Sequence, residues 1–302
     1  MSCINYNNAI NILTNMSSAY PIIINQSNLV SGSTNSFQYN FSSNVDMSNV
    51  DIGLSSASLW FSWPNITAAK SNNQFSIIHP TLAGSTTLAI TIPDGGYNIS
   101  DLNYYLRYYL ITQGYYIQNT ASGDQTVYAE FRVNPSIYAV EFVSYPVPTA
   151  LPTGYSAGPS ISFPAVSSGP QLIVGQVAFG TVIGFAVGTF PSVAPTTITA
   201  TKSTITPQVS DIQNVLLTLD SANNPFAPNS KIIHSISPAG AAYGSLITST
   251  PPEISWVPQQ SGTRQSITLQ LTDQRLRPLY MVDTDVTIKL LIRYRDESKI
   301  IR

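Results

Sequence analysis

The chain has 302 residues and a formal net charge of −2, and only 9% of its residues are charged. Ordinary soluble domains carry about 25% charged residues, so this surface suits a subunit covered by identical neighbours better than a lone monomer. The small negative charge gives no electrostatic signal for nucleic-acid binding, and the single cysteine, Cys3, excludes a disulfide framework within the chain.

Neither a secretion signal nor a membrane span is predicted. The first residues lack the basic and apolar regions of a signal peptide. The longest apolar stretch, residues 172–188, is shorter than the roughly 20 residues of a spanning helix, and it contains Gln176, Thr181 and several glycines. We expect two buried strands joined by a turn there.

The N-terminal third combines an irregular start with a run of strands. Residues 1–34 are rich in Asn and Ser without regular apolar spacing, which predicts an N-terminal arm that is dispensable for folding. Between residues 37 and 92, β-branched and aromatic residues alternate with polar ones and are interrupted by prolines and glycines. This pattern is typical of β-strands.

One helix is predicted at about residues 98–113. Asn98 is a favourable N-cap, and Asp101 three residues later can complete a capping box. Leu102, Leu106 and Leu110 then recur at helical spacing and form one apolar face. Gly114 follows, as glycine often does where a helix ends. The helix is therefore amphipathic and is expected to lie across a sheet.

The remaining two thirds of the chain predict further strands. Residues 127–147 indicate a hairpin that turns at Asn134 and Pro135. Residues 142–201 contain no acid, base or histidine, and their apolar runs indicate an ordered β module rather than disorder. Clear alternation returns near residues 215–219, 232–236, 267–271 and 286–294. The last of these strands is expected to lie centrally in a sheet and to continue the sheet of residues 267–271.

Many short strands and one helix predict an all-β fold, which we interpret as a single jelly-roll β sandwich with an inserted β module. The expected boundaries are an arm at 1–34, a base domain built from 35–118 and 210–302, and an inserted domain at 119–209. Both crossings between base and insertion are expected at one end of the sandwich.

Side chains that support catalysis are scarce and scattered. The two histidines, His79 and His234, lie in no metal-binding pattern. Glu141 and Glu253 have no acidic partner nearby in the sequence. We therefore expect no catalytic residue, no metal, no cofactor and no enzymatic activity.

Basic residues gather in the last forty or so positions, interleaved with acidic ones. This mixture is not a nucleic-acid-binding arm. It indicates either a solvated strand face and tail or a rim of ion pairs between subunits.

Several stretches, taken in order and with their spacing, resemble one viral family. They are residues 57–67 (ASLWFSWPNIT), 90–103 (ITIPDGGYNISDLN), 138–148, 183–191 and 273–279. Together they resemble the penton, or minor capsid, proteins of virophages and polinton-like viruses, and they span most of the chain.

The resemblance implies a structural capsid protein, five copies of which close each icosahedral vertex. Strands would stand upright to the shell, with the insertion facing outward. The implied partners are the chain itself, as a homopentamer, and the hexon-like capsomers of the major capsid protein. The implied location is the virion, after synthesis in the host-cell cytoplasm without secretion.

Two other functions remain open at this point. One is a surface module that binds a receptor or carbohydrate, with Tyr155 and Tyr243 as candidates for stacking on sugars. The other is an internal cement protein of the shell.

Overall fold

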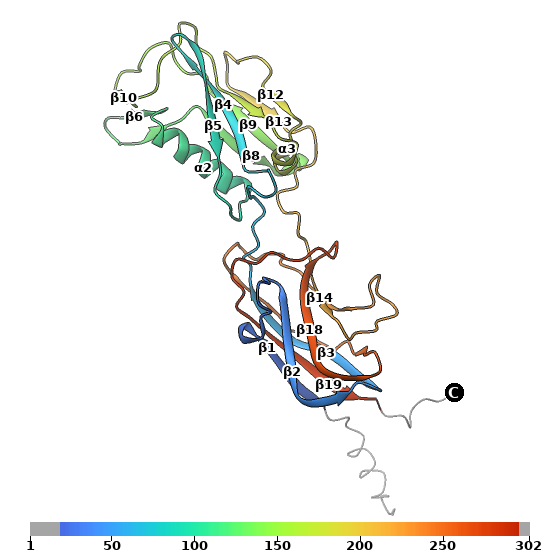
Figure 1. Ribbon diagram of the computed structural model, residues 1–302. Helices are drawn as coiled ribbons and strands as arrows, with labels where there is room; N and C mark the ends of the chain where they lie inside the picture. Colours follow the sequence, from blue (N-terminus) through green and yellow to red (C-terminus); the bar gives the residue numbers. More distant parts are fainter. Residues whose placement is uncertain (1–18, 296–302) are drawn as a thin grey trace, which may run out of the picture. The chain divides into compact units, whose positions relative to one another are not determined.

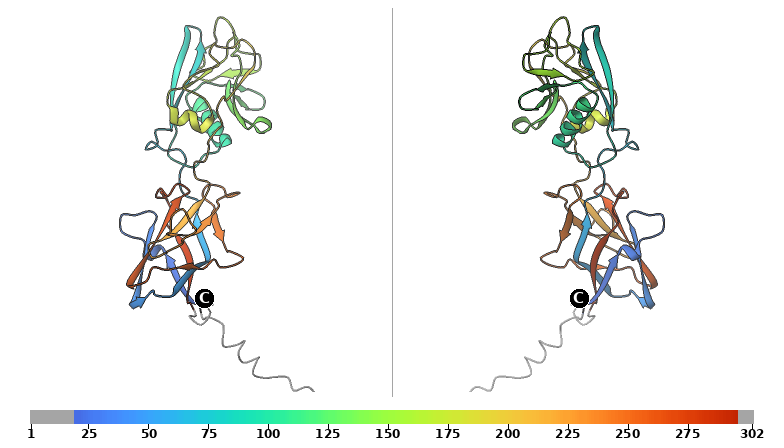
Figure 2. Two further views of the ribbon diagram at one scale, coloured as in Figure 1. Left: turned by 90° about the vertical axis from the view of Figure 1, so that its right-hand side faces the viewer. Right: turned by 90° about the vertical axis from the view of Figure 1, so that its left-hand side faces the viewer.

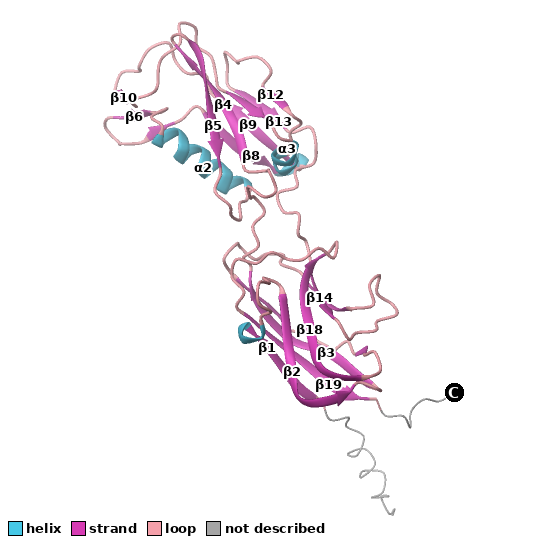
Figure 3. Ribbon diagram, viewed as in Figure 1, coloured by secondary structure: helices cyan, strands magenta, loops and turns pink. Residues whose placement is uncertain are grey.

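The computed structural model describes residues 19–295, and strands and loops dominate it (Figure 3). Cys3 lies outside the described residues. The chain divides into two compact units: unit 1 comprises residues 1–63 and 212–302, and unit 2 comprises residues 64–211. Unit 1 combines strands from both ends of the chain, blue and red in Figures 1 and 2, whereas unit 2 is one continuous insertion.

Unit 1 contains two antiparallel sheets. One sheet has the order β1-β19-β3-β16, and β17 also pairs with β3. The other has the order β15-β14-β18-β2. The strands of the first sheet are β1 (Tyr20–Asn25), β19 (Val286–Tyr294), β3 (Val50–Trp60), β16 (Leu246–Ser249) and β17 (Val257–Pro258). Those of the second are β15 (Ile232–Ile236), β14 (Val215–Leu219), β18 (Thr263–Asp273) and β2 (Ser36–Asp46).

The order of these strands is that of a jelly roll. Along the chain, β1, β2, β3 and β14 alternate between the two sheets, and so do β17, β18 and β19. This alternation wraps two antiparallel sheets around one core, as jelly rolls do. Unit 2 is inserted between β3 and β14. The predicted all-β jelly-roll sandwich is therefore confirmed.

The core of unit 1 is made by inward-facing residues of both sheets. Strand β19 is central, because it pairs with β1 on one side and β3 on the other. Its Ile288 and Leu290 are fully buried. The central position of the last strand was predicted correctly. Its expected continuation with residues 267–271 is wrong, because β18 belongs to the opposite sheet, where it pairs with β14 and β2.

Part of the expected arm is a strand. Residues 20–25 form β1, which pairs with β19 from Tyr20 opposite Ile292 to Asn25 opposite Thr287. Ile22 and Ile24 alternate into the core and are buried. A 3₁₀ turn, Gln26–Asn28, follows under an Asn25 capping box and leads to β2. The prediction that residues 1–34 form an arm is wrong for this segment, because alternating isoleucines complete the sheet edge.

Unit 2 contains three small sheets and two helices. The first sheet has the order β12-β11-β4-β5, the second β13-β9-β8 and the third β10-β6-β7. The first comprises β12 (Gly188–Phe190), β11 (Gln171–Val174), β4 (Gln74–Thr81) and β5 (Gly84–Thr91). The others comprise β13 (Thr199–Lys202), β9 (Ala139–Ser144), β8 (Ala129–Asn134), β10 (Tyr155–Ala157), β6 (Ile117–Asn119) and β7 (Gln125–Thr126).

The predicted helix is confirmed as α2 (Ile99–Thr112). Asn98 and Asp101 form the reciprocal capping box, and Leu102, Leu106 and Leu110 are buried. Gly114 follows with a φ of +83°, and a Cβ there would lie 2.7 Å from the Pro159 ring. Glycine therefore suits both the backbone and the packing at this position.

Helix α2 lies along two sheet edges, β5 and β8 (Figure 1). The Tyr105 and Tyr109 hydroxyls donate to the carbonyls of Thr91 and Ala89 on β5, at 2.8 and 2.9 Å. On β8, the backbone N–H of Phe131 donates to Asn103 Oδ1 at 2.9 Å. The helix thus hydrogen-bonds to both strand edges, a common protection of exposed edges.

The predicted hairpin is present, with β8 and β9 joined by a 3₁₀ turn at Pro135–Ile137. Residues 172–188, in contrast, are not two strands joined by a turn. A seven-residue helix, α3 (Val177–Ile183), separates β11 from β12. Phe179, Val182 and Ile183 are buried on one face of it, and Gly184 ends it in the left-handed conformation. Helical burial of these three side chains overrides the β propensity of the sequence.

The expected domain boundaries differ from the two units. Residues 64–118 belong to unit 2, so the insertion begins at Pro64 rather than at residue 119. The reason is a shared core: Ile77 and Ile90 of the first sheet, Leu106 of α2 and Phe142 of β9 are buried together. The C-terminal boundary, near residue 211, lies close to the expected one.

Candidate functional site

Within residues 19–295, no group of three or more acidic, His or Cys side chains is placed to hold a metal ion. His79 is the more buried of the two histidines. Its Nδ1 donates to the carbonyl of Pro80 at 2.9 Å, and its ring lies 4.9 Å from that of Tyr115. Burial lowers the pKa of His79 to about 4. A neutral, enclosed imidazole of this kind serves packing in unit 2.

The other titratable residues singled out from the sequence are not brought together. His234 lies half-buried on β15, where burial lowers its pKa, and Glu253 is exposed in a loop of unit 1. Glu141 lies on β9 of unit 2, where Arg132 donates to its carboxylate at 2.7 Å. Hydrogen bonds from Asn134 and Arg132 lower the pKa of Glu141. This carboxylate therefore stays ionised as a structural partner of β8.

A shallow hollow of ≈ 370 Å³ lies on the outer face of β4, β5 and β11. Amides and hydroxyls of Gln74, Ser76, Thr91 and Gln176 line it, together with apolar residues that include Phe75, Ile90 and Ile173. The lining contains no titratable side chain, so the hollow can offer hydrogen bonds but no acid–base chemistry.

The C-terminal arginines pair with carboxylates of the same unit. Buried Asp51 lies 3.3 Å from Arg293 and 3.2 Å from Arg295, and the Arg293 guanidinium stacks over Trp256 at 4.2 Å. Arg264 pairs with Asp220 in the same way. This internal pairing favours a structural role over a rim of ion pairs between subunits.

Arg277 and Asp273 close the turn after β18, with 2.6 Å between Nη2 and Oδ2. Burial alone would raise the pKa of Asp273, but backbone and side-chain hydrogen bonds from Arg277, with one from the Arg275 backbone, lower it overall. The carboxylate therefore holds the turn in its ionised form.

The two flanks of unit 1 are almost without charge. The first, here called the β1–β2 flank, is formed by residues 19–45 and contains no charged residue. The second, the β15–β16 flank, is formed by residues 221–249, and Lys231 is its one charged residue. Because β1 and β2 end their sheets on one side and β15 and β16 end them on the other, the flanks face away from each other. Uncharged flanks cost little to desolvate, which suits assembly.

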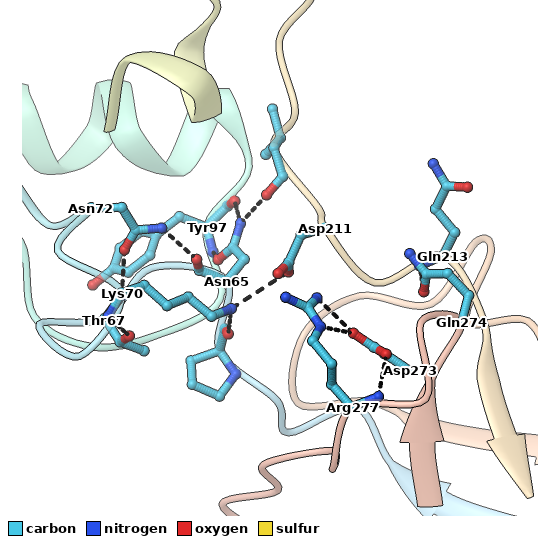
Figure 4. A network of polar contacts seen from close by, with 12 residues as sticks. Asn65, Thr67, Lys70, Asn72, Tyr97, Asp211, Gln213, Asp273, Gln274 and Arg277 are labelled. Atoms are coloured by element: carbon cyan, nitrogen blue, oxygen red, sulfur yellow. Dashed lines mark hydrogen bonds and ion pairs between the residues drawn. The ribbon is translucent and has the colours of Figure 1, made fainter. Parts of the chain in front are cut away.

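The two chain segments at which unit 2 begins and ends are joined by a polar network (Figure 4). The Asn65 side chain donates to the carbonyls of Tyr97 and Val209 and accepts from the Tyr97 N–H. Lys70 Nζ donates to the Pro64 carbonyl at 3.0 Å and pairs with Asp211 at 3.4 Å. This clasp fixes both ends of unit 2 next to each other.

The two tyrosines considered for carbohydrate stacking lie in different units. Tyr155 is on β10 and packs beside a small buried cluster of unit 2. Tyr243 contacts the Phe61 ring of unit 1 edge-on, with 5.9 Å between centroids. Each ring is thus engaged within its own unit. Among the described helices, neither is long and apolar enough to cross a membrane.

The architecture defines a single jelly-roll β sandwich with a large β unit inserted between its third and fourth strands. No family model and no curated protein matches the sequence. Among solved structures, the chain is similar to the mavirus penton protein, with 10% identity and a TM-score of 0.41 over 91% of this chain and 99% of that one. It is also similar to a protein chain in the cryo-EM structure of the Sputnik virophage, with 13% identity and a TM-score of 0.39 over 94% and 99% of the two chains. The likeness to a virophage penton protein expected from the sequence motifs is thus also found among solved structures.

Proposed function

We propose that this chain is a structural subunit of a viral capsid and that five copies of it close a vertex of an icosahedral shell. The observation that carries the proposal is the jelly roll of unit 1 with its two opposite, nearly uncharged flanks. A contact between the β1–β2 flank of one copy and the β15–β16 flank of the next is heterologous. Repeating such a contact closes a ring when the rotation from one copy to the next is a whole-number fraction of a full turn.

The sequence motifs support the viral assignment, since they resemble those of virophage penton proteins in order and spacing. The pairing of arginines with carboxylates inside unit 1 supports a rigid building block. In this proposal, the hexon-like capsomers of the major capsid protein surround the ring, and the outer surface of unit 2 is available to other partners.

Locating the chain in purified particles tests the proposal. A tag can be inserted into this protein in the exposed loop near Val166. Cryo-EM of virions that contain the tagged protein should then show five extra densities at each vertex. A tag in the loop near Val282, outside both flanks, serves as a second label, in unit 1. Density inside the shell away from the five-fold axes would indicate a cement protein and contradict the proposal.

A further inference from the structure

Phe226 of unit 1 is an apolar side chain that is almost fully exposed to solvent. Phe226 is 96% exposed, the largest value for any large apolar side chain among the described residues. It lies in the loop between β14 and β15, at the β15–β16 flank. Exposed aromatic side chains that become buried in a partner are the usual anchors of protein interfaces.

The loop that carries Phe226 is braced by hydrogen bonds. The N–H of Asn224 donates to the Ser230 carbonyl at 2.7 Å, and its side-chain amide donates to the Ile232 carbonyl at 3.1 Å. The N–H of Phe226 itself donates to Asn224 Oδ1 at 3.1 Å. Binding through this loop therefore requires little further ordering, which favours affinity.

The opposite flank has apolar side chains that the subunit itself covers incompletely. Tyr39 and Phe41 of the edge strand β2 pack against the core but stay partly exposed, with 5.5 Å between their ring centroids. On the edge strand β1, Tyr20 is 57% exposed and lies on the same face as the buried Ile22 and Ile24, which is the inward face toward Tyr39 and Phe41. Residues 19–45 contain no charged residue, so a phenyl ring that packs beside Tyr39 and Phe41 would desolvate mainly apolar and neutral polar groups.

The base of the Phe226 loop and Tyr39 also lie at the same level along the sandwich. The loop leaves β14 at Asp220, whose N–H donates to the Thr268 carbonyl of β18. Tyr39 of β2 pairs with Ile267, the neighbouring residue of the same strand. A ring formed by rotation about an axis parallel to the strands brings together surfaces at equal levels.

We propose that Phe226 of one copy packs against the β1–β2 edge of a second copy of this chain, at Tyr20, Tyr39 and Phe41. This inference rests on the proposed function and adds to it the anchor that joins adjacent subunits. The contact is heterologous, because donor and acceptor lie on opposite flanks.

The first test compares two Phe226 variants with a matched control. Phe226→Ser should weaken the subunit contact by at least about tenfold in dissociation constant, as expected for an interface anchor, whereas Phe226→Tyr retains it. The control is Val282→Ser, which changes another exposed apolar residue of unit 1, 65% exposed, in the loop between β18 and β19. Native mass spectrometry over a dilution series measures the oligomer, and tryptophan fluorescence checks that unit 1 remains folded.

The second test traps the contact directly. In a Cys3→Ser background, a chain with Phe226→Cys is mixed with a chain with Tyr20→Cys, and the mixture is oxidised. Disulfide-linked dimers are expected from this pair and not from the pair Val282→Cys with Tyr20→Cys. Equal cross-linking of both pairs would overturn the inference.

The outcomes separate this inference from the proposed function. A parent pentamer that Phe226→Ser leaves intact contradicts the anchor and leaves the vertex function standing. A parent chain that stays monomeric at every concentration, and forms no disulfide-linked dimer, contradicts both.

Discussion

The division into two units makes a sharp prediction about which part of the chain can be removed. Replacing Pro64–Asp211 by about eight Gly/Ser residues should leave unit 1 folded. Every residue of the unit 1 core lies in residues 1–63 or 212–302, and every residue of the unit 2 core lies in residues 64–211. Neither core therefore loses an apolar contact within itself when the other unit is removed.

The expected effect on unit 1 is small. For a flexible loop, each halving of its length contributes about 0.6 kcal/mol of stability through loop-closure entropy. Shortening the insertion to about eight residues halves its length roughly four times, so the replacement changes the free energy of unfolding of unit 1 by at most about 2.5 kcal/mol. The actual change should be smaller, because the clasp at Asn65 and Lys70 already holds the ends of unit 2 together.

A deletion of residues 119–209, the boundaries expected from the sequence, should behave in the opposite way. It removes Phe131 and Phe142 from the unit 2 core and leaves the apolar residues of β4, β5 and α2 without partners. Each such side chain contributes about 1.5–3 kcal/mol by burial. Exposing Ile77, Ile90 and Leu106 alone costs about 5–9 kcal/mol, comparable with a whole domain's stability of about 5–15 kcal/mol.

Tryptophan fluorescence separates the two units in this experiment. All three tryptophans, Trp60, Trp63 and Trp256, lie in unit 1. The Pro64–Asp211 replacement should retain the cooperative tryptophan transition of the parent, and the 119–209 deletion should lose the helical circular dichroism of α2. Loss of the tryptophan transition in the first variant, or a retained helix in the second, would refute the assignment of units.

Three further predictions concern unit 2 and are read from its unfolding by circular dichroism. Folding lowers the pKa of His79 from about 6.5 to about 4, so between pH 4 and pH 6.5 the unfolded chain binds a proton that the folded chain does not. The free energy of unfolding should therefore fall by about 3 kcal/mol as the pH drops from 6.5 to 4. His79→Phe should remove this pH dependence, and His234→Gln should not. Tyr105→Phe should cost about 1 kcal/mol, because a β5 carbonyl loses its hydroxyl donor, whereas Tyr104→Phe, a 73% exposed control on the same helix, should be neutral. Asn98→Ala should cost about 1 kcal/mol by removing the cap of α2, and an unchanged midpoint would show that the capping box contributes nothing.

Elements with strong local signals could be predicted from the sequence. Helix α2 has a capping box, leucines at helical spacing and a terminal glycine, and each is a short-range feature of the chain. Strand β19 alternates Val286, Ile288, Leu290 and Ile292 inward, and its length favoured a central position. For these elements, local preference and tertiary burial point in the same direction.

Features that depend on contacts between distant segments could not be predicted from local signals in the sequence. The alternation of Ile77 and Ile90 predicts burial, but nothing local shows that they pack with Phe142 rather than with the base sandwich. Strand β1 was missed because Pro21 and the Asn-rich surroundings mask two inward isoleucines. Helix α3 was missed because its valines and glycines favour strands and turns, and only the buried Phe179 face stabilises it as a helix.

The candidate surfaces were only partly predictable. Low charge indicated assembly, but the concentration of uncharged residues on two opposite flanks follows from strand order, which composition does not reveal. The basic C-terminal cluster was left with two interpretations, a solvated strand face and tail or a rim of ion pairs between subunits. Arg293 and Arg295 instead pair with Asp51 inside unit 1, an arrangement that neither interpretation named, because Asp51 is distant in the sequence.

The most direct test of the vertex assignment is the mass of the assembled chain. Native mass spectrometry of the purified 32.7 kDa protein should show a single oligomer of five copies that dissociates on dilution without intermediate rings. A monomer or a symmetric dimer as the largest species at every concentration would contradict the account.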